Sequence, residues 1–254
     1  TEEDVSQDAL IPRLGLVYSI SPKINVYGTY VQGFQPQTAT VINNPDAGGP
    51  FDPLTSELLE MGAKSEWFDG KLSGSLALYN LKEWGSLYNA NEPGQPDLLV
   101  QNGEEVSKGV EIDLAGNITP NWSITVSYTF NDAVITQSDD ENLIGRQKPN
   151  APRNTGNIWT KYLIKQGSLT GLGFGFGANF VSERFGSLGS SENPPIFPSY
   201  ELFDAAVYYK MNRFQIQMNV NNLFDKTHWV GGYDYLRAFP GAPRNAMTTI
   251  SYIF

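Results

Sequence analysis

The chain has 254 residues, no cysteine and a formal net charge of −10. This charge disfavours a nucleic-acid partner held through its phosphates. The lack of cysteine excludes disulfides, thiolate metal ligands and a cysteine nucleophile. The length suits one all-β domain, and no apolar run reaches the ~18 residues of a membrane helix.

Alternation of apolar and polar residues with a period of two predicts about eleven strands. In chain order they span residues 13–20, 24–33, 56–68, 71–84, 104–118, 121–133, 154–165, 172–185, 200–211, 214–224 and 246–254. Most are close to the ~9 to 11 residues that a tilted strand needs to cross a bilayer. We therefore predict an all-β, antiparallel fold.

The predicted connections alternate strictly between short and long. The short turns are residues 21–23, 69–70, 120–121, 166–171 and 212–213, and the long loops are 34–55, 85–103, 134–153, 186–199 and 225–245. Transmembrane β-barrels have short turns on the periplasmic side and longer loops outside the cell. A soluble sandwich has no physical reason to gather its long loops at one end.

Charged residues also separate from the apolar side of the strands. The charges on the polar side are Glu60, Lys64, Glu111, Asp113, Asp204 and Lys210. A lysine or arginine facing lipid at the midplane costs roughly 2 to 4 kcal/mol, so this separation favours a lipid-facing surface. Aromatic residues gather at the strand ends, as in the girdles at the two membrane interfaces. The faces of strand 154–165 stay open, because Trp159 and Leu163 share a side with Lys161.

The last predicted strand ends on the side of the short turns. Because the number of predicted strands is odd, the first strand must begin on the long-loop side, and Thr1 lies there too. Single-chain bacterial barrels have an even number of strands. We therefore expect either one miscounted strand or the second half of a barrel of 22 strands, the size of transporters with a plugged lumen.

Six stretches resemble a known family: residues 25–37, 56–81, 106–130, 145–162, 219–229 and 240–254, among them NVNNLFDKTHW and PGAPRNAMTTISYIF. The chain resembles the C-terminal half of the β-barrel of a TonB-dependent outer-membrane receptor of the ferric-siderophore type. The resemblance implies that residues 1–254 are the C-terminal part of this barrel in the bacterial outer membrane. It also implies that no plug domain and no TonB-binding segment precede Thr1.

The resemblance further implies the partners. These are a ferric siderophore, TonB acting through the plug, outer-membrane lipid and lipopolysaccharide, and the barrel-assembly machinery, which would read the terminal Phe254. We expect no protein-bound cofactor or metal, because iron would arrive inside its chelate as substrate. Two alternatives stay open: a passive, porin-like channel, and a soluble all-β binding or hydrolytic module.

Catalytic motifs are missing from the sequence, which contains no Gly-x-Ser-x-Gly, HExxH, Walker or EF-hand pattern. We interpret the single histidine, His228, as an incidental loop or interface residue, and we expect no enzyme. A bulky chelate needs aromatic walls and hydrogen-bond donors. If the resemblance holds, the candidate ligand-binding residues in the outer vestibule are Phe34, Trp84, Tyr88, Arg146, Phe185, Trp229, Tyr233, Tyr235 and Arg237. The carboxylates of Glu60, Glu111, Asp113 and Asp204 are expected to contact one another or a plug.

Overall fold

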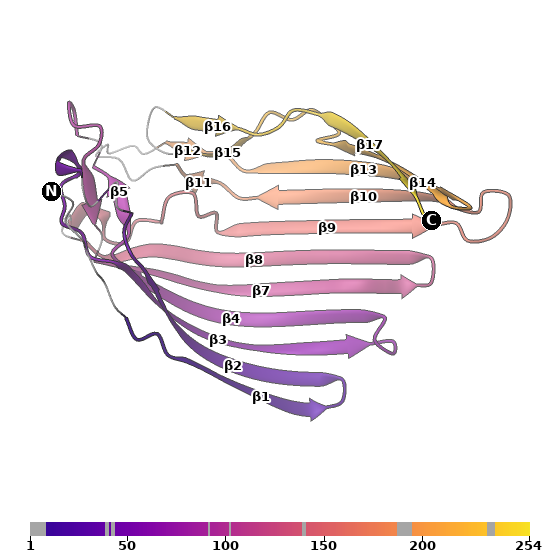
Figure 1. Ribbon diagram of the computed structural model, residues 1–254, viewed down its shortest axis with the longest axis horizontal. Helices are drawn as coiled ribbons and strands as arrows, with labels where there is room; N and C mark the ends of the chain where they lie inside the picture. The colour runs from indigo at the N-terminus through magenta and orange to yellow at the C-terminus, as the bar shows by residue number, and fades with distance from the viewer. Residues whose placement is uncertain are drawn as a thin grey trace.

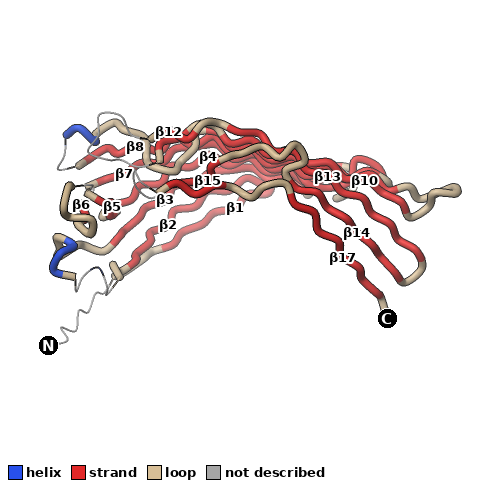
Figure 2. The backbone as a smooth tube through the Cα atoms, turned by 90° about the horizontal axis from the view of Figure 1, so that it is seen from above, coloured by secondary structure: helices blue, strands red, loops and turns tan. Residues whose placement is uncertain are grey.

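The computed structural model describes residues 9–38, 41, 44–90, 92–101, 103–138, 141–186, 195–232 and 237–254. They form one curved antiparallel sheet of eleven strands, in the order β1-β2-β3-β4-β7-β8-β9-β10-β13-β14-β17 (Figure 1). Each long strand pairs with the next long strand along the chain, and the sheet bends into an arch (Figure 2).

The long strands have the following bounds: β1 Arg13–Ser21, β2 Ile24–Gln35, β3 Leu54–Trp67, β4 Leu72–Trp84, β7 Glu104–Thr119, β8 Trp122–Gln137, β9 Asn154–Leu163, β10 Leu172–Val181, β13 Tyr200–Met211, β14 Phe214–Asn221 and β17 Asn245–Tyr252. The prediction of eleven antiparallel strands is therefore confirmed. The connections alternate as predicted, with short turns at one end of the sheet and long loops at the other (Figure 1).

Three predicted strand ends were wrong by three or more residues. The strand predicted over 172–185 stops at Val181, and a separate short strand follows it. The strand predicted over 214–224 stops at Asn221, because Asn222 has a φ of 50° and turns the chain out of the ladder. In the opposite direction, β8 continues to Gln137, four residues beyond its predicted end.

The long loops contain short elements of their own. These are η1 (Pro45–Ala47), β5 (Leu87–Asn89) paired with β6 (Leu99–Gln101), η2 (Glu141–Leu143), β11 (Arg184–Phe185) paired with β12 (Ile196–Phe197), and β15 (Trp229–Gly232) paired with β16 (Ala238–Pro240). Within the described part of the chain, no helix is long and apolar enough to cross a membrane.

The strand register separates the sheet into two faces. On the face that we call apolar, one row across the sheet joins Gly28, Met61, Leu78, Val110 and Phe130. Its large side chains are mostly 40% exposed or more, for example Leu16, Met61, Phe174 and Met218. A water-soluble protein rarely exposes so continuous an apolar surface.

The opposite face, which we call polar, carries the six charged residues that the sequence assigned to it. Glu111, for instance, lies between Ala77 on β4 and Thr129 on β8. The apolar face has charges too, but on β3, β4, β7 and β8 these lie toward the long-loop end: Glu57, Lys82, Lys108 and Asp132. Across the middle of these strands, the charged side chains therefore lie on the polar face alone.

The register also assigns the faces of β9. Trp159, Lys161 and Leu163 lie opposite Gly177, Gly175 and Gly173 on the polar face. The indole ring of Trp159 occupies the space that a Cβ at Gly175 or Gly177 would need. Lys161 Nζ lies 3.9 Å from the centroid of the Tyr208 ring on the same face. The glycines of β10 thus make room for the large side chains of its neighbour.

Candidate ligand-binding site at the long-loop end

The described parts of the five long loops form one connected structure, which we call the loop cap: residues 36–38, 41, 44–53, 85–90, 92–101, 103, 138, 141–153, 182–186, 195–199, 222–232 and 237–244. Its first link joins the first two loops through two glutamines. Gln37 Nε2 and Gln101 Nε2 each donate to the carbonyl oxygens of Asp52 and Gly85, at 2.8 to 3.0 Å. The side-chain Oε1 of Gln101 in turn accepts from the Asp52 backbone N–H at 3.1 Å.

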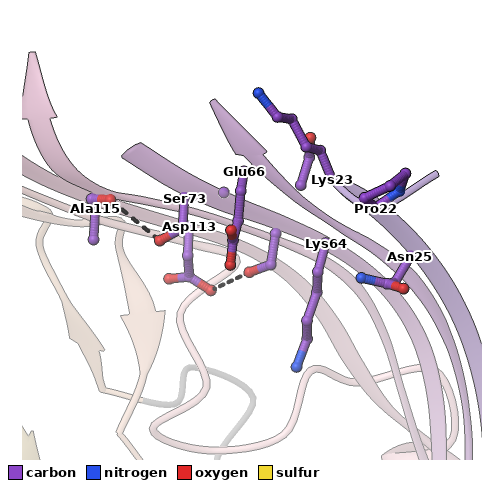
Figure 3. A pocket seen from close by; sticks show the side chains of 11 residues that line it. Pro22, Lys23, Asn25, Lys64, Glu66, Ser73, Asp113 and Ala115 are labelled. Atoms are coloured by element: carbon purple, nitrogen blue, oxygen red, sulfur yellow. Dashed lines mark hydrogen bonds between the residues drawn. The ribbon is translucent and has the colours of Figure 1, made fainter. Parts of the chain in front are cut away.

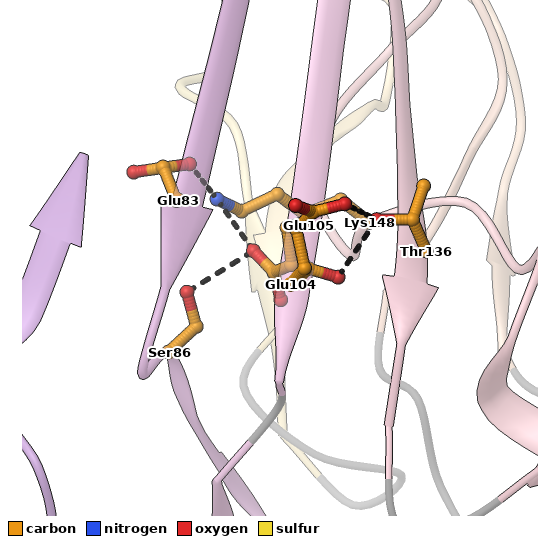
Figure 4. Close-up of polar contacts among 6 residues, drawn as sticks. All are labelled: Glu83, Ser86, Glu104, Glu105, Thr136 and Lys148. Atoms are coloured by element: carbon orange, nitrogen blue, oxygen red, sulfur yellow. Dashed lines mark hydrogen bonds and ion pairs between the residues drawn. The ribbon is translucent and has the colours of Figure 1, made fainter. Parts of the chain in front are cut away.

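A buried ionic cluster links the third loop to the sheet (Figure 4). Lys148 Nζ lies 2.6 Å from a carboxylate oxygen of Glu83 on β4 and 2.9 Å from one of Glu105 on β7. The hydroxyl of Ser86 donates to Glu105 at 3.1 Å. Glu105 is 1% exposed, so its charge depends on these partners for stabilisation.

The ionic cluster shifts the pKa of two loop residues. Burial first, and then the charge and hydrogen bond of Glu105, raise the pKa of Tyr88, so its hydroxyl stays protonated. For Lys148, burial lowers the pKa, but the carboxylates of Glu105 and Glu83 more than compensate and raise it above its ordinary value. Both groups therefore hold their protons at neutral pH. The ring of Tyr88 packs against Ile135 and Leu143, the small apolar core of the loop cap.

Asn150 joins the third, fourth and fifth loops. Its side-chain amide donates to the Gly232 carbonyl at 2.7 Å and accepts from the Gly232 N–H at 3.0 Å. Its own backbone N–H donates to the Phe185 carbonyl at 2.7 Å. Asn150 has a φ of 56°, a left-handed conformation that asparagine tolerates better than most residues. One residue thus ties together segments that lie up to 82 positions apart.

Arg184 makes a second link between the fourth and fifth loops. Its Nη2 donates to the Trp229 carbonyl at 2.6 Å, and the guanidinium lies 5.6 Å and 5.8 Å from the ring centroids of Phe197 and Tyr200. Arg184 is 3% exposed, and its Nη1 has no hydrogen-bond partner among the described residues. The single histidine lies nearby in the fifth loop, where the rings of His228 and Tyr200 are 4.8 Å apart.

The structure places the predicted ligand-binding residues in different surroundings. Phe34 and Trp84 both lie opposite Thr55, on the apolar face. This corrects their predicted place in the vestibule, since their side chains leave the sheet on the apolar face and not on the polar face. We therefore leave these two residues out of the proposed vestibule.

Five other predicted residues lie in the loop cap. Tyr88 is packed into its core, and the Arg146 carbonyl accepts from the Ile135 N–H at 3.0 Å. Phe185 and Trp229 lie beside the Asn150 and Arg184 links, and Arg237 is exposed next to β16. Tyr233 and Tyr235 lie outside the described residues. The structure thus places Phe185 at the Asn150 link and Trp229 at the Arg184 link, and it places Arg237 on the exposed surface.

Sequence reasoning missed Asn150, Arg184 and Lys148. A Pro-Asn pair at 149–150 is a turn signal that could have drawn attention to Asn150. Arg184 was hidden inside a predicted strand that ends three residues earlier. Nothing local marks Lys148, because its carboxylate partners come from two distant strands.

Among the described residues, hollows lie at both ends of the sheet. One of about 430 Å³ is in the loop cap and is lined by Pro45, Asp46, Gly48, Gly94, Gln95, Pro96, Asp97 and Leu98. The other, of about 390 Å³, lies beside the short turns (Figure 3). Its polar wall includes Lys64, Glu66 and Asp113, and Ser75 donates to Asp113 at 3.3 Å. The second hollow is too far from the loop cap to belong to the same site.

Chemically, the loop cap offers aromatic rings, amide groups and a few cations. Among the described residues, no group of three or more histidine, aspartate or glutamate side chains could hold a metal ion. Such a surface can bind a large polar ligand by stacking and hydrogen bonding.

An antiparallel sheet with an exposed apolar face, short turns at one end and long loops at the other defines the wall of a transmembrane β-barrel. The family model "TonB dependent receptor-like, beta-barrel" matches residues 1–223. The chain therefore belongs to the TonB-dependent receptors, which are transporters and not enzymes.

Named relatives agree with this assignment. The metal-pseudopaline receptor CntO of Pseudomonas aeruginosa is 30% identical over 253 residues, which are 99% of this chain and 34% of that protein. The ferric-pyoverdine 358 receptor of Pseudomonas putida is 30% identical over 257 residues, or 98% of this chain and 30% of that protein. The chain thus spans about a third of the length of these relatives.

Solved structures show the same fold. The pyoverdine outer membrane receptor FpvA from Pseudomonas aeruginosa PAO1, bound to pyoverdine, superposes with a TM-score of 0.77 at 26% identity, over 96% of this chain and 36% of that chain. The siderophore receptor PiuA from Acinetobacter baumannii gives a TM-score of 0.79 at 24% identity, over 94% and 35%.

Proposed function

We propose that this chain forms eleven strands of a 22-stranded receptor barrel that takes up a ferric siderophore across the bacterial outer membrane. The observation that carries the proposal is the match of nearly the whole chain, in order, to receptors named for pyoverdine, ferrioxamine B and metal-pseudopaline. The apolar face would contact lipid, and the loop cap would form part of the outer vestibule.

In this proposal the ligand meets the loop cap first. Phe185, Trp229 and Arg237 offer aromatic surface and one accessible cation, while Tyr233 and Tyr235 stay predictions. Many siderophore complexes are anionic, so a cation among aromatic rings would suit them. Asn150 and Arg184 would hold the loops in place without touching the ligand. Iron would be cargo inside its chelate, and the protein would hold no resident cofactor or metal.

The remaining partners complete the proposal. TonB would act through a plug domain held against the polar face, where Glu60, Glu111, Asp113 and Asp204 could contact it. Lipopolysaccharide would surround the outer part of the apolar face. The barrel-assembly machinery would recognise the last strand, where the ring centroids of Tyr252 and Phe254 lie 5.1 Å apart.

An uptake assay tests the proposal. The full-length receptor would be produced in a bacterium that lacks its own siderophore receptors, and the cells would be given iron-55 complexes of pyoverdine, ferrioxamine B and a catecholate siderophore. We expect uptake of at least one complex, and we expect it to disappear in an otherwise identical strain without TonB. Uptake that persists without TonB would indicate a passive channel, and no uptake across a broad panel would refute the siderophore assignment.

A further inference from the structure

A row of side-chain hydrogen bonds crosses the polar face of the sheet near its long-loop end. It runs over the neighbouring strands β9, β10 and β13 (Figure 1). Asn157 Nδ2 donates to Asn179 Oδ1 at 2.5 Å, and Asn179 Nδ2 donates to Asp204 Oδ2 at 3.0 Å. The backbone N–H of Asn222, the first residue of the fifth loop, donates to Asp204 Oδ1 at 2.8 Å. We call these four residues the polar row.

Asp204 is the acceptor on which both ends of the polar row converge. A carboxylate only accepts hydrogen bonds, whereas an amide both donates and accepts, so every donor in the row points toward Asp204. Hydrogen bonds to a charged group are roughly twice as strong as neutral ones. Within the described part of the chain Asp204 forms no ion pair, so these N–H groups are the partners that stabilise its charge. Asp204 therefore holds the row together.

Asn222 extends this hold to both arms of the fifth loop. Its side-chain oxygen accepts from the Lys226 N–H at 2.8 Å, and its side-chain amide donates to the carbonyls of Lys226 at 2.9 Å and Ala242 at 3.2 Å. Asn222 is 4% exposed and has a φ of 50°. Lys226 belongs to the outgoing arm and Ala242 to the returning arm. One buried side chain thus closes the base of the loop.

A candidate ligand residue stands directly on this base. The Gly241 N–H donates to the His228 carbonyl at 2.9 Å, which joins the two arms a second time. His228 is 7% exposed, and its ring leaves no room for a Cβ at Gly241. Trp229 follows at once and begins the hairpin of β15 and β16. Trp229 is therefore carried by a frame that Asn222 and Asp204 fasten to the polar face.

We propose that Asp204 is a positioning residue, which holds the fifth loop against the barrel wall and so keeps Trp229 in place for the ligand. The inference rests on the proposed function, because it takes the long loops as the place where the ligand binds. It gives Asp204 a partner in the loop cap, whereas Asp113 accepts from Ser75 on the neighbouring strand. A carboxylate that holds a loop and a carboxylate that binds a cation of the plug respond differently to substitution.

Hydrogen exchange in the full-length receptor separates the hydrogen bonds of Asp204 from its charge. Asp204→Leu removes the acceptor, so exchange at the amides of Asn222 and Lys226 should become roughly 10- to 100-fold faster. Asp204→Asn keeps an acceptor for the Asn222 N–H. The side-chain amides of Asn179 and Asn157 can rotate by half a turn and accept in place of donating, so the row is kept without its charge. Exchange should then be only ~3- to 10-fold faster.

Two further variants guard against a general loss of folding. Asn222→Gly keeps the positive φ and the backbone N–H for Asp204 but loses the side-chain bonds, so exchange should accelerate more at Lys226 than at position 222. Gln217→Leu removes a polar-face hydrogen bond of 3.0 Å, to Asn219, that involves no loop. This control should leave both loop amides as in the wild type. Amides at the centre of β7 should be unchanged in every variant.

Uptake kinetics connect the loop to the ligand. For a siderophore that the wild type takes up, Asp204→Leu should raise the KM at least about threefold and leave the maximal rate unchanged, because a displaced loop weakens binding and not the energised step. Asp204→Asn should lie between this variant and the wild type. Contact with a cation of the plug would be lost equally in both variants, since both lack the charge, and the maximal rate would fall.

Several results would overturn the inference: wild-type exchange in Asp204→Leu, equal acceleration in the leucine and asparagine variants, acceleration in the Gln217→Leu control, or an unchanged KM in Asp204→Leu, with or without a lower maximal rate. If the wild type takes up no siderophore, the proposed function fails, while the exchange results still decide whether Asp204 holds the loop. Normal wild-type uptake together with unchanged exchange in Asp204→Leu would refute this inference alone.

Discussion

Replacing Lys148 by methionine should open the loop cap locally. The substitution leaves the carboxylates of Glu105 and Glu83, which are 1% and 20% exposed, without the ammonium group 2.9 Å and 2.6 Å away. Breaking a buried ion pair by removing one partner costs ~3 to 5 kcal/mol. Because Lys148 is itself 27% exposed, we take the lower limit. The free energy of local opening should then fall by about 3 kcal/mol.

Hydrogen exchange measures this opening. The amide protons of Ile135 and Lys148 bond to the carbonyls of Arg146 and Ala133, so they report the contact between the third loop and β8. A loss of about 3 kcal/mol corresponds to exchange about 150-fold faster at these amides. Amides at the centre of β10, such as that of Phe176, should be unaffected.

A matched control separates burial from charge. Lys226 forms an ion pair with Glu201 at a similar distance, 3.0 Å, but the two side chains are 43% and 52% exposed. Lys226→Met should therefore cost less than about 1 kcal/mol. Adding Glu105→Gln to Lys148→Met should restore part of the protection, because it removes the uncompensated buried charge. Equal effects at Lys148 and Lys226, or no restoration by Glu105→Gln, would refute the reasoning.

The same cluster predicts a dependence on pH. The pKa of Lys148 is raised above the ordinary 10.5, so its contribution to stability is complete below pH 10.5 and is lost as the pH rises through the raised value. The pKa of Tyr88 is also raised, so its loss of a proton acts in the same direction. Exchange at Lys148 should accelerate above about pH 10.5 beyond the intrinsic rate in the wild type. A wild-type profile that shows no such acceleration would contradict the cluster.

Three further sets of substitutions test the loop links, the two faces, and the packing of Trp159 against the glycines of β10. Asn150→Gly keeps the left-handed backbone but loses both side-chain hydrogen bonds, so it should loosen the fourth and fifth loops by about 1 to 2 kcal/mol; Asn150→Ala should cost more because of its φ. Proteolysis of intact cells would show both effects, and equal resistance in all three forms would disprove the link. Leu76→Arg puts a charge on the apolar face and should cost about 2 to 4 kcal/mol in reversible folding into lipid, whereas Ser75→Arg on the polar face should be nearly neutral. A reversed order would mean that the faces are misassigned. Gly177→Ala places a Cβ 2.5 Å from Trp159 and should cost about 1 to 3 kcal/mol, recovered in part by Trp159→Ala. If the two substitutions are additive in unfolding by urea, the contact is not the cause.

Much of the sheet could be predicted because a strand has a period of two. Phe214, Ile216 and Met218 fall on one face by local geometry alone, and the structure places all three on the apolar face. The ends of the strands were less predictable. At the end of β14, Asn222 leaves the sheet because of its own backbone conformation, and its side chain forms hydrogen bonds with Lys226 and Ala242.

The candidate site could be predicted only in part. Composition and loop length pointed to aromatic and cationic residues in the long loops, and five of the nine chosen residues lie in the described loop cap. Phe34 and Trp84 were chosen because they lie near long loops. A position near the end of a strand does not tell which face of the sheet the side chain occupies. Their side is set by the register through Thr55.

The sequence by itself determined the number of strands, the alternation of turns and loops, and the separation of apolar from charged side chains, because each depends on residues close together in the chain. The tertiary structure decided what depends on pairing at a distance. Trp159 could join the polar face because Gly175 and Gly177 on the next strand leave room for its ring. Lys148 became part of a buried cluster because β4 and β7 bring Glu83 and Glu105 opposite each other. The register of the strands fixes which residues are neighbours across a sheet. The local sequence pattern of one strand does not determine that register.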